Sequence, residues 1–585
     1  MKKWKYSAWG LFGLIAVTLF VFMQREYAYH FYFVEQNYMF QYSWPYIVEK
    51  LLLPGGLADI AGEFLVQYFM YPYAGASITV GLLALIASVT ALLLGRIRQN
   101  DSWAVLSWIP ASCLLFMQFD FNYMLAGFVA YLFMLFFLLG AVTIRNDRWR
   151  LVYHVLTLFP MYWIGGSVYV LYVASVLLYE LLKKTPYRYT VTLILIGLGA
   201  LIGYLSIYFA LQGEYRFAFL PDMFYHNKLI PKPPIYFSWV AHFLLFGLAL
   251  LLKPRKVKKT VRCVFELVFS LVVVFLFTAW GIRQYGDQKS QQLKKLDYYA
   301  RMEQWDEVIN HSKGTLTNYL YICYLNRALA EKGQLAESMF LFDQRGVDGL
   351  LLKWNRTFSI STLLSDVNFT IGNMTVAQEM AFEANVSATG GGNPRMLKRL
   401  IQTNLIYGEY KVAEKYIDLL EKTTYYRKWA ELQRLFLYND EAVEKDSLLG
   451  SKRKCLLSEN YLSTTFGLDH DLLKIAKQYP ANRNALEYLG GLLLLAKDMQ
   501  AFKLFLDTYY GTELLPELPL GFQEAVIILH ESAPAEWEKY GIRESVAERF
   551  VHYKKAILAN KNSPSLQQRM AHDYGNTYWF YFMFK

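Results

Sequence analysis

Runs of about twenty apolar residues recur through the first half of this chain. A helix that crosses the hydrocarbon core of a bilayer needs roughly 20 apolar residues. We predict membrane spans at about 7–23, 76–95, 103–119, 123–144, 190–211, 236–252 and 260–282. With 55% hydrophobic and only 18% charged residues among 585, the chain is too apolar for a single soluble globule. Bulky and charged residues follow the first run, so we expect an uncleaved anchor there.

The apolar stretch at 151–182 is too long for one ordinary span and short for two. Pro160 and the triplet Gly165-Gly166-Ser167 interrupt it in the middle, and basic residues flank both ends. We predict a hairpin of two short helices that returns to the side from which it entered, which gives about nine spans in all. A non-helical turn at membrane depth is tolerated only where protein or a water-filled cavity surrounds it. The hairpin tip is therefore a candidate cavity wall.

Basic residues mark the side of the membrane on which each connection lies. The N-terminus and the segments 96–101, 145–150, 183–188 and 253–262 together carry 17 Lys and Arg. The last segment alone holds Lys253, Arg255, Lys256, Lys258, Lys259 and Arg262. The opposite connection, 24–75, has two basic residues and five carboxylates. The bias predicts a multi-pass membrane protein with an inside N-terminus and, after an odd number of spans, an outside C-terminal half.

The connection 24–75 is dense in aromatic residues and has the pattern of an amphipathic external segment. From Pro45 onward it favours two helical pieces separated by Leu53-Pro54-Gly55-Gly56. Two interpretations remain open. Aromatic rings with polar tips favour the headgroup layer, so the segment anchors the first two spans. Alternatively, carboxylates such as Glu35 and Asp59 line an outward-facing cleft that a lipid-borne substrate enters.

Two further external connections carry candidate site residues. Asp120, in a tight turn between two predicted spans, either caps the following helix or points into the same cleft. A helical turn would place Asp222 and His226 on one face, as a proton-transfer pair or as a plain hydrogen bond. The candidates for substrate binding, all in the proline-stiffened connection 212–235, are Arg216, Asp222, His226, Lys228 and Lys232.

The C-terminal half has the pattern of a soluble domain of paired amphipathic helices. In segments 319–340, 396–420 and 484–509, apolar and small residues recur at spacings of three and four on both sides of a polar or glycine turn. This pattern resembles the tetratricopeptide repeat. Segment 345–395 and the stretch from Ser532 onward fit it poorly. We therefore predict an all-α chain with a transmembrane domain at 1–282 and a periplasmic helical-repeat domain at 283–585.

The repeat-like domain also has predicted partners. Stacked helical pairs form a curved surface that typically grips a protein or an extended chain. The last residues, from Tyr574 to Phe584, are strongly aromatic. Because a free end with this much apolar surface would be sticky, we expect it to dock on the repeat domain, on the bilayer or on a partner.

Motif searches leave several classes of function without support. No GxxxxGK[ST], HExxH, GxSxG or CxxC motif occurs, which disfavours P-loop, zinc-peptidase, serine-hydrolase and redox functions. We expect the four cysteines to be small buried hydrophobic residues: Cys113, Cys263, Cys323 and Cys455. Many basic residues behind the formal charge of +11 lie in short connections between spans, so the charge indicates lipid headgroups rather than nucleic acid.

The whole layout, an aromatic-rich membrane domain followed by helical repeats, resembles a family of uncharacterised polytopic proteins from Bacteroidota. That resemblance implies an inner-membrane protein with a periplasmic tail and no particular chemistry. A weaker resemblance is to membrane-embedded glycosyltransferases that use polyprenyl-phosphate-linked sugars. These also combine a first span, a long external segment with interfacial helices and an acidic residue, further spans and a soluble periplasmic domain.

In such glycosyltransferases an external carboxylate acts as a base, or as a ligand of a divalent metal ion, at the lipid phosphate. The resemblance implies that role for Glu35, Asp59, Glu63 or Asp120, with Arg216, Lys228 or Lys232 as phosphate partners. The external connections of the membrane domain contain no DxD or equivalent acidic pair.

Two other functions stay open at the level of sequence. One is a non-enzymatic scaffold that organises envelope partners through the repeats. The other is a lipid or polymer transporter, which is disfavoured by the scarcity of ionisable residues within the predicted spans.

Overall fold

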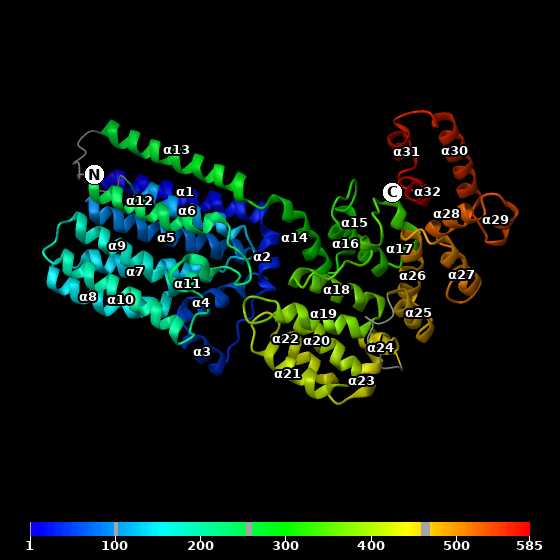
Figure 1. Cartoon of the computed structure of the whole chain (residues 1–585), viewed down its shortest axis with the longest axis horizontal. Helices are drawn as coiled ribbons and strands as arrows, with labels where there is room; N and C mark the ends of the chain where they lie inside the picture. Colours follow the sequence, from blue (N-terminus) through cyan, green and yellow to red (C-terminus); the bar gives the residue numbers. More distant parts are fainter. Residues whose placement is uncertain (1, 99–102, 253–259, 458–467) are drawn as a thin grey trace. The chain divides into compact units, whose positions relative to one another are not determined.

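The computed structural model describes residues 2–98, 103–252, 260–457 and 468–585. Within these ranges the chain is helical, with isolated β-bridges but no β-strand, which confirms the predicted all-α class. It forms two compact units (Figure 1). The first contains Met1–Gln291 together with Thr389–Gly391 and Lys422–Tyr425, and the second contains the remainder. The basic cluster at 253–262 lies outside the residues whose side chains are described, so its topological role stays a prediction.

Seven helical stretches in the described part of the chain are long and apolar enough to cross a membrane. Several of these long helices run side by side in the first unit (Figure 1). The stretches are Trp9–Glu26 in α1 (Lys2–Glu26), α5 (Ala74–Arg98), α7 (Ala126–Thr143), Asp147–Leu182, α10 (Arg188–Tyr208), Pro233–Leu251 ending in α12 (Phe237–Leu251), and Phe265–Tyr285 in α13 (Thr260–Tyr285). The predicted span at 103–119 is a shorter apolar helix, formed by η1 (Val105–Ser107) and α6 (Trp108–Gln118).

The stretch Asp147–Leu182 is a helical hairpin, as the sequence predicts. It consists of α8 (Asp147–Gly165), η2 (Gly166–Val168) and α9 (Tyr169–Leu182). Arg150 Nε donates to Glu180 Oε1 at 2.6 Å, although a straight helix would separate residues thirty apart by about 45 Å. The helix continues through Pro160 and ends at Gly165, so the prediction that Pro160 also breaks it was wrong.

The hairpin tip is packed by a methionine from the connection 212–235. A Cβ built on Gly166 would lie 2.4 Å from Met223 Sδ, and one built on Gly55 would lie 2.5 Å from Met223 Cε. Both glycines also have a positive φ, +78° at Gly55 and +57° at Gly166, a backbone conformation that other residues adopt only with strain. Ser167 N also donates to Met223 Sδ at 3.5 Å. Here the expected cavity wall is instead a packed contact among the hairpin, the external segment and the connection 212–235.

The external segment 24–75 contains three helices. The two pieces expected after Pro45 are α3 (Trp44–Leu51) and α4 (Gly56–Val66), and they are preceded by α2 (Ala28–Glu35). None of the α3 residues is buried. Large exposed apolar side chains cluster on α3, the following turn and the start of α4: Trp44, Leu51, Leu52, Leu53 and Leu57. This apolar surface suits the headgroup layer, as expected for an interfacial segment.

The second unit contains helical pairs at the three predicted places. They are α16 (Tyr319–Glu331) with α17 (Leu335–Ser338), α20 (Pro394–Tyr407) with α21 (Tyr410–Glu421), and α26 (Arg483–Leu495) with α27 (Met499–Tyr509). A fourth close pair, α18 (Phe358–Ile371) with α19 (Met374–Val386), occupies the segment expected to fit poorly. Every residue of 361–371 is buried, including polar residues such as Asp366, which pairs with arginines of neighbouring helices. Membership of the tetratricopeptide class stays a prediction.

The remaining helices complete both units. In the first unit they are α11 (Tyr215–Phe219), η3 (Pro221–Phe224) and η4 (Pro233–Tyr236). In the second they are α14 (Gln288–Arg301, whose start lies in the first unit), α15 (Trp305–Asn310), η5 (Met339–Leu341), η6 (Val347–Gly349), α22 (Arg427–Gln433), η7 (Arg434–Phe436), α23 (Asp440–Lys445), α24 (Ser447–Arg453), α25 (Leu468–Gln478), α28 (Leu520–Leu529), α29 (Ala535–Lys539), α30 (Glu544–Asn560), α31 (Leu566–Tyr574) and α32 (Tyr578–Phe584).

A buried ionic network joins four helices of the second unit. Asp366 on α18 pairs with Arg327, Arg395 and Arg399 at 3.0, 2.7 and 2.9 Å. Arg395 also pairs with Asp297 at 2.7 Å. Although burial opposes ionisation, the three guanidinium groups hold the pKa of Asp366 well below its ordinary value. The network therefore fixes α14, α16, α18 and α20 relative to one another.

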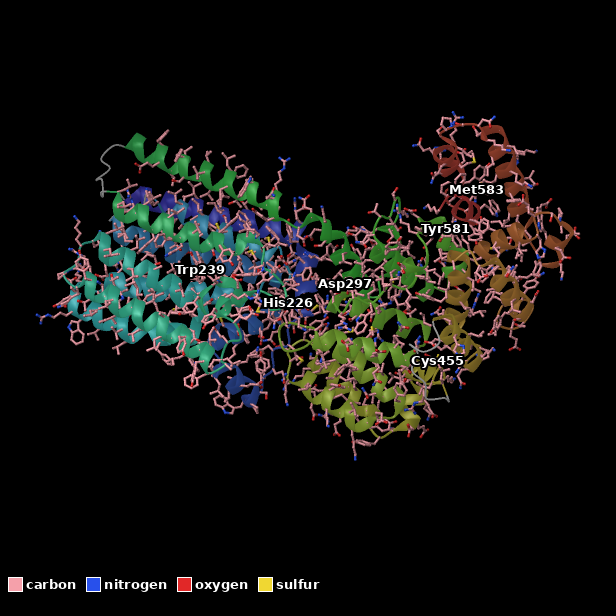
Figure 2. All side chains as sticks on the ribbon, in the orientation of Figure 1. His226, Trp239, Asp297, Cys455, Tyr581 and Met583 are labelled. Carbon is pink, nitrogen blue, oxygen red and sulfur yellow. The ribbon has the colours of Figure 1, made fainter. Side chains whose placement is uncertain are left out.

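The aromatic tail packs within the second unit. Of the three places where the sequence predicts docking, this is the helical C-terminal domain and not the bilayer or another protein. In α32, Tyr578, Trp579, Phe580 and Tyr581 are buried, whereas Met583 is half exposed. Figure 2 labels Tyr581 and Met583. Tyr581 Oη donates to the Leu495 carbonyl at 2.8 Å, and Trp579 Nε1 donates to the Glu524 carbonyl at 2.8 Å.

The cysteines follow the prediction where their side chains are described. Cys113, Cys323 and Cys455 are buried and free. Cys263 lies outside the residues whose side chains are described.

Candidate functional site

Asp120 fixes the turn between α6 and α7 to the connection 212–235. Its Oδ2 accepts from Tyr225 Oη at 3.0 Å and pairs with Lys232 Nζ at 2.7 Å, and its Oδ1 accepts from Asn122 N at 3.1 Å. Burial opposes ionisation, but Lys232 and the hydrogen bonds lower the pKa of Asp120. No side chain caps α7, so the helix-capping alternative was wrong. Asp120 therefore links two external connections and has a structural role.

Backbone hydrogen bonds strengthen this link between the two connections. Met124 N donates to Phe224 O at 2.9 Å, and His226 N donates to Asn122 O at 3.0 Å. Tyr123 and Tyr225 between them form an antiparallel bridge. The connection 212–235 is therefore held against the α6–α7 turn along several residues.

The other candidates in the connection 212–235 have separate partners. Asp222 accepts from Tyr236 Oη at 2.6 Å, and His226 Nδ1 accepts from the Lys228 amide at 3.2 Å. Asp222 lies in the 3-10 turn η3 and Tyr225 is extended, so the predicted helical turn joining Asp222 to His226 was wrong. Arg216 pairs with Glu214 at 2.6 Å, and Lys228 is exposed. Burial and the nearby Lys228 lower the pKa of His226, which is labelled in Figure 2.

The carboxylates of α4 face α3. Buried Glu63 accepts from Lys50 Nζ at 2.9 Å and from Tyr46 Oη. Burial, reinforced by the charge of Glu63 and opposed by Lys50, raises the pKa of Asp59 to about 7. Sequence reasoning missed Tyr46 and Lys50, although their spacing of four matches that of Asp59 and Glu63 on the facing helix.

Glu35 belongs to a buried polar run directly after the first candidate span. His30, Glu35, Gln36 and Asn37 are each at most 2% exposed. Carboxylates are rarely buried so completely unless they are paired. Of these four residues, only Glu35 was predicted as a site residue. The signal for the others is a cluster of polar residues in an otherwise aromatic stretch.

Two short segments from later in the chain complete the first unit around this run. Gly390 N donates to Asn37 O at 2.8 Å, and Met39 N donates to Gly390 O at 2.9 Å. Tyr42 N donates to Lys422 O at 2.8 Å. The backbone that follows Glu35 is thus bound at two places by residues 389–391 and 422–425.

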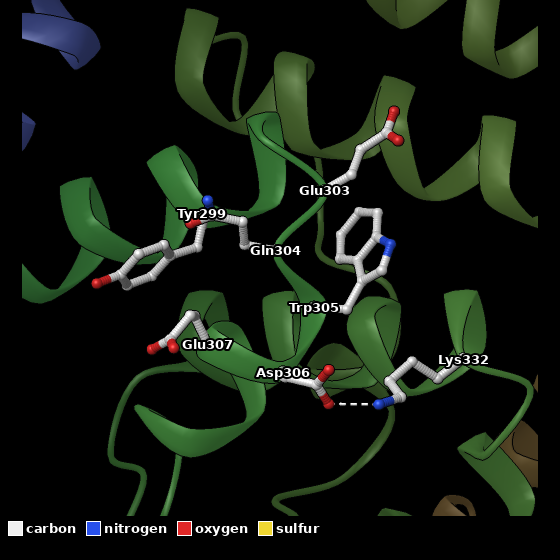
Figure 3. Close-up of a pocket in the computed structure, with 7 residues that line it drawn as sticks. All are labelled: Tyr299, Glu303, Gln304, Trp305, Asp306, Glu307 and Lys332. Carbon is white, nitrogen blue, oxygen red and sulfur yellow. Dashed lines mark hydrogen bonds and ion pairs between the residues drawn. The ribbon is translucent and has the colours of Figure 1, made fainter. Parts of the chain in front are cut away.

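The second unit has an open hollow of about 590 Å³ at the start of α15. Its lining residues are Tyr299, Glu303, Gln304, Trp305, Asp306, Glu307 and Lys332. Figure 3 shows Glu303 and Glu307 pointing in different directions, and Asp306 paired with Lys332. The carboxylates do not converge, and none of the predicted site residues lies here.

The candidate carboxylates do not form an evident metal centre. Among the residues that the structure describes, no group of three or more His, Cys, Asp and Glu is suited to hold a metal ion. The carboxylate of Glu63 is already bound by Lys50 and Tyr46. The carboxylate of Asp120 is bound by Lys232 and Tyr225. These donor sets do not fit the divalent ion that the glycosyltransferase resemblance implies.

The all-helical fold and its long apolar helices are compatible with a multi-pass membrane protein. The chain belongs to a family of unknown function, DUF6057, whose model matches residues 2–585. This whole-chain match agrees with the predicted resemblance to an uncharacterised family. No curated protein and no solved structure shows a significant match.

Proposed function

We propose that the protein is a membrane enzyme that transfers a sugar from a polyprenyl-phosphate-linked donor to an acceptor hydroxyl. The observation that carries this proposal is the buried Glu35, with its polar neighbours, directly after the first candidate span. The acceptor oxygen forms a bond to the anomeric carbon while the bond from that carbon to the phosphate oxygen breaks. Glu35 takes the hydroxyl proton as general base, and the lipid phosphate leaves with the bonding electrons.

Asp59 supports the proposal from the neighbouring helix. Its pKa of about 7 suits a group that accepts a proton near neutral pH. The exposed leucines of the α3–α4 turn, 51–53, offer an apolar surface on which a lipid-borne donor arrives.

Substituting the carboxylates of the external segment tests the proposal. Glu35→Gln should lower turnover of a radiolabelled polyprenyl-phosphate sugar in proteoliposomes at least about 100-fold, because it removes the general base. We expect the wild-type rate to decline as pH falls below about 7, and Asp59→Asn should lower turnover and abolish that decline. Glu49→Gln, an exposed carboxylate of the same segment, should have no effect. Wild-type turnover by Glu35→Gln would contradict the proposal and favour the scaffold function.

The proposed reaction requires the segment 24–75 to face the side that holds the acceptor. We infer a bacterial inner-membrane location with a cytoplasmic N-terminus and a periplasmic C-terminal half. The excess of Lys and Arg in alternate connections supports this orientation. Alkaline phosphatase fused after Lys585 should be active in cells, and green fluorescent protein fused there should be dark. The reverse pattern would invert the orientation.

A further inference from the structure

The backbone after Glu35 is held by a clasp, defined here as Gly390 and Thr424 with their contacts in the first unit. α2 ends at Glu35, and Tyr38 N donates back to Glu35 O at 3.0 Å. The next residues leave the helix and form a parallel bridge between Tyr38 and Gly390. The bridge lies three residues from the carboxylate, so it restricts where α2 can end.

Glycine is required at position 390 by this close approach. A Cβ built on Gly390 would lie 2.1 Å from Tyr38 Cδ1 and 2.9 Å from the Asn37 carbonyl oxygen. Contacts below 3.0 Å force a shift, and here one of the atoms belongs to the backbone. Any side chain at this position therefore displaces residues 37–38.

Thr424 holds the other end of the same segment. Its Oγ1 is 2.6 Å from Gln67 Oε1 and 3.2 Å from Tyr42 Oη. The adjoining Lys422 carbonyl accepts from the Tyr42 amide at 2.8 Å. Tyr425 stacks edge-on against Tyr71, with ring centroids 5.7 Å apart. Residues 422–425 thus tie the stretch 38–42 to the end of α4.

We propose that Gly390 and Thr424 are positioning residues that hold Glu35 in the geometry required for proton transfer. The inference rests on the proposed function, in which Glu35 is the general base. Neither residue touches the reacting atoms. Each acts through the main chain of 37–42, so its loss lowers kcat more than it changes KM for the lipid-linked donor.

Hydrogen exchange and kinetics on the full-length protein in proteoliposomes test the clasp. Gly390→Ala should speed exchange of the Met39 amide at least about tenfold, because its acceptor Gly390 O is displaced. Thr424→Val keeps the side-chain shape and should speed exchange at Tyr42. Both variants should lower kcat about tenfold or more with KM within about threefold. Gly81→Ala is the matched control, because no atom lies within 4 Å of a Cβ at Gly81.

The outcomes separate the clasp from the proposed function. Faster exchange with unchanged kcat, in a protein that Glu35→Gln inactivates, would overturn the positioning role and leave the proposed function intact. Unchanged exchange in Gly390→Ala would show that the clasp is absent. Full activity of Glu35→Gln would overturn the proposed function, while the exchange results would still report on the clasp.

Discussion

Replacing Trp579 by alanine should lower the free energy of unfolding of the second unit by about 3–5 kcal/mol. The indole is 1% exposed, and its ring centroid lies 5.1 Å from that of Phe550. Its Nε1 also donates to the Glu524 carbonyl at 2.8 Å. The substitution therefore leaves a cavity and removes a buried hydrogen bond. Pulse proteolysis of the full-length protein across a urea series measures the change.

Met583 provides the matched control for Trp579. It lies on the same helix, α32, but is 51% exposed. Met583→Ala should change the stability by less than about 0.5 kcal/mol. Equal, small effects of the two substitutions would contradict the docking of α32.

The same docking should depend on pH through Glu524. Its Oε2 accepts from the Tyr578 amide at 2.6 Å, and burial raises its pKa to about 7. An unfolded chain releases this proton near pH 4.5, whereas the folded chain retains it up to about 7. Stability should therefore fall by about 3 kcal/mol as pH rises between these values. Glu524→Gln should remove that dependence, and an unchanged pH profile would contradict the assignment.

Replacing Glu180 by alanine should destabilise the α8–α9 hairpin by about 3 kcal/mol. The carboxylate is 2% exposed and accepts from Arg150 Nε at 2.6 Å. It also lies 3.3 Å from His154 Nε2 and accepts from Thr185 Oγ1. Alanine leaves the buried guanidinium with Asp147 as its remaining carboxylate partner. The midpoint of thermal unfolding in detergent should fall accordingly.

A double-mutant cycle separates the ion pair from general packing. Arg150→Ala combined with Glu180→Ala should cost less than the sum of the two single substitutions, because the double variant buries no unpaired charge. Glu49→Ala, at an exposed carboxylate, should leave the unfolding midpoint unchanged. Additive effects of Arg150→Ala and Glu180→Ala would contradict a coupled pair.

Much of the fold could be predicted because apolar length and helical periodicity are local signals. The hairpin was predicted from Gly165-Gly166 and from the basic residues at both ends. The pair α20 and α21 was predicted from amphipathic spacing around Gly408. Segment 345–395 fits the repeat spacing poorly, yet it contains the pair α18 and α19, and all residues of 361–371, polar ones included, are buried. Pro160 was wrongly predicted to interrupt the helix, because α8 continues through it.

The candidate site was harder to predict because it depends on pairing between distant segments. Sequence spacing suggested a pair of Asp222 with His226, but tertiary contacts pair Asp222 with Tyr236 instead. Asp120 was a candidate base, but its bonds to Tyr225 and Lys232 give it a structural role that links two connections. The role of Gly390 rests on an approach to Tyr38 that no local pattern encodes.

The most direct measurement of the central claim is turnover by the purified wild-type protein in proteoliposomes supplied with a panel of polyprenyl-phosphate monosaccharides. The account predicts that at least one donor is consumed, with release of one polyprenyl phosphate for each sugar transferred, and that Glu35→Gln slows this release at least about 100-fold. Release at the same rate by wild type and Glu35→Gln, or no release from any donor by correctly folded protein, would contradict it.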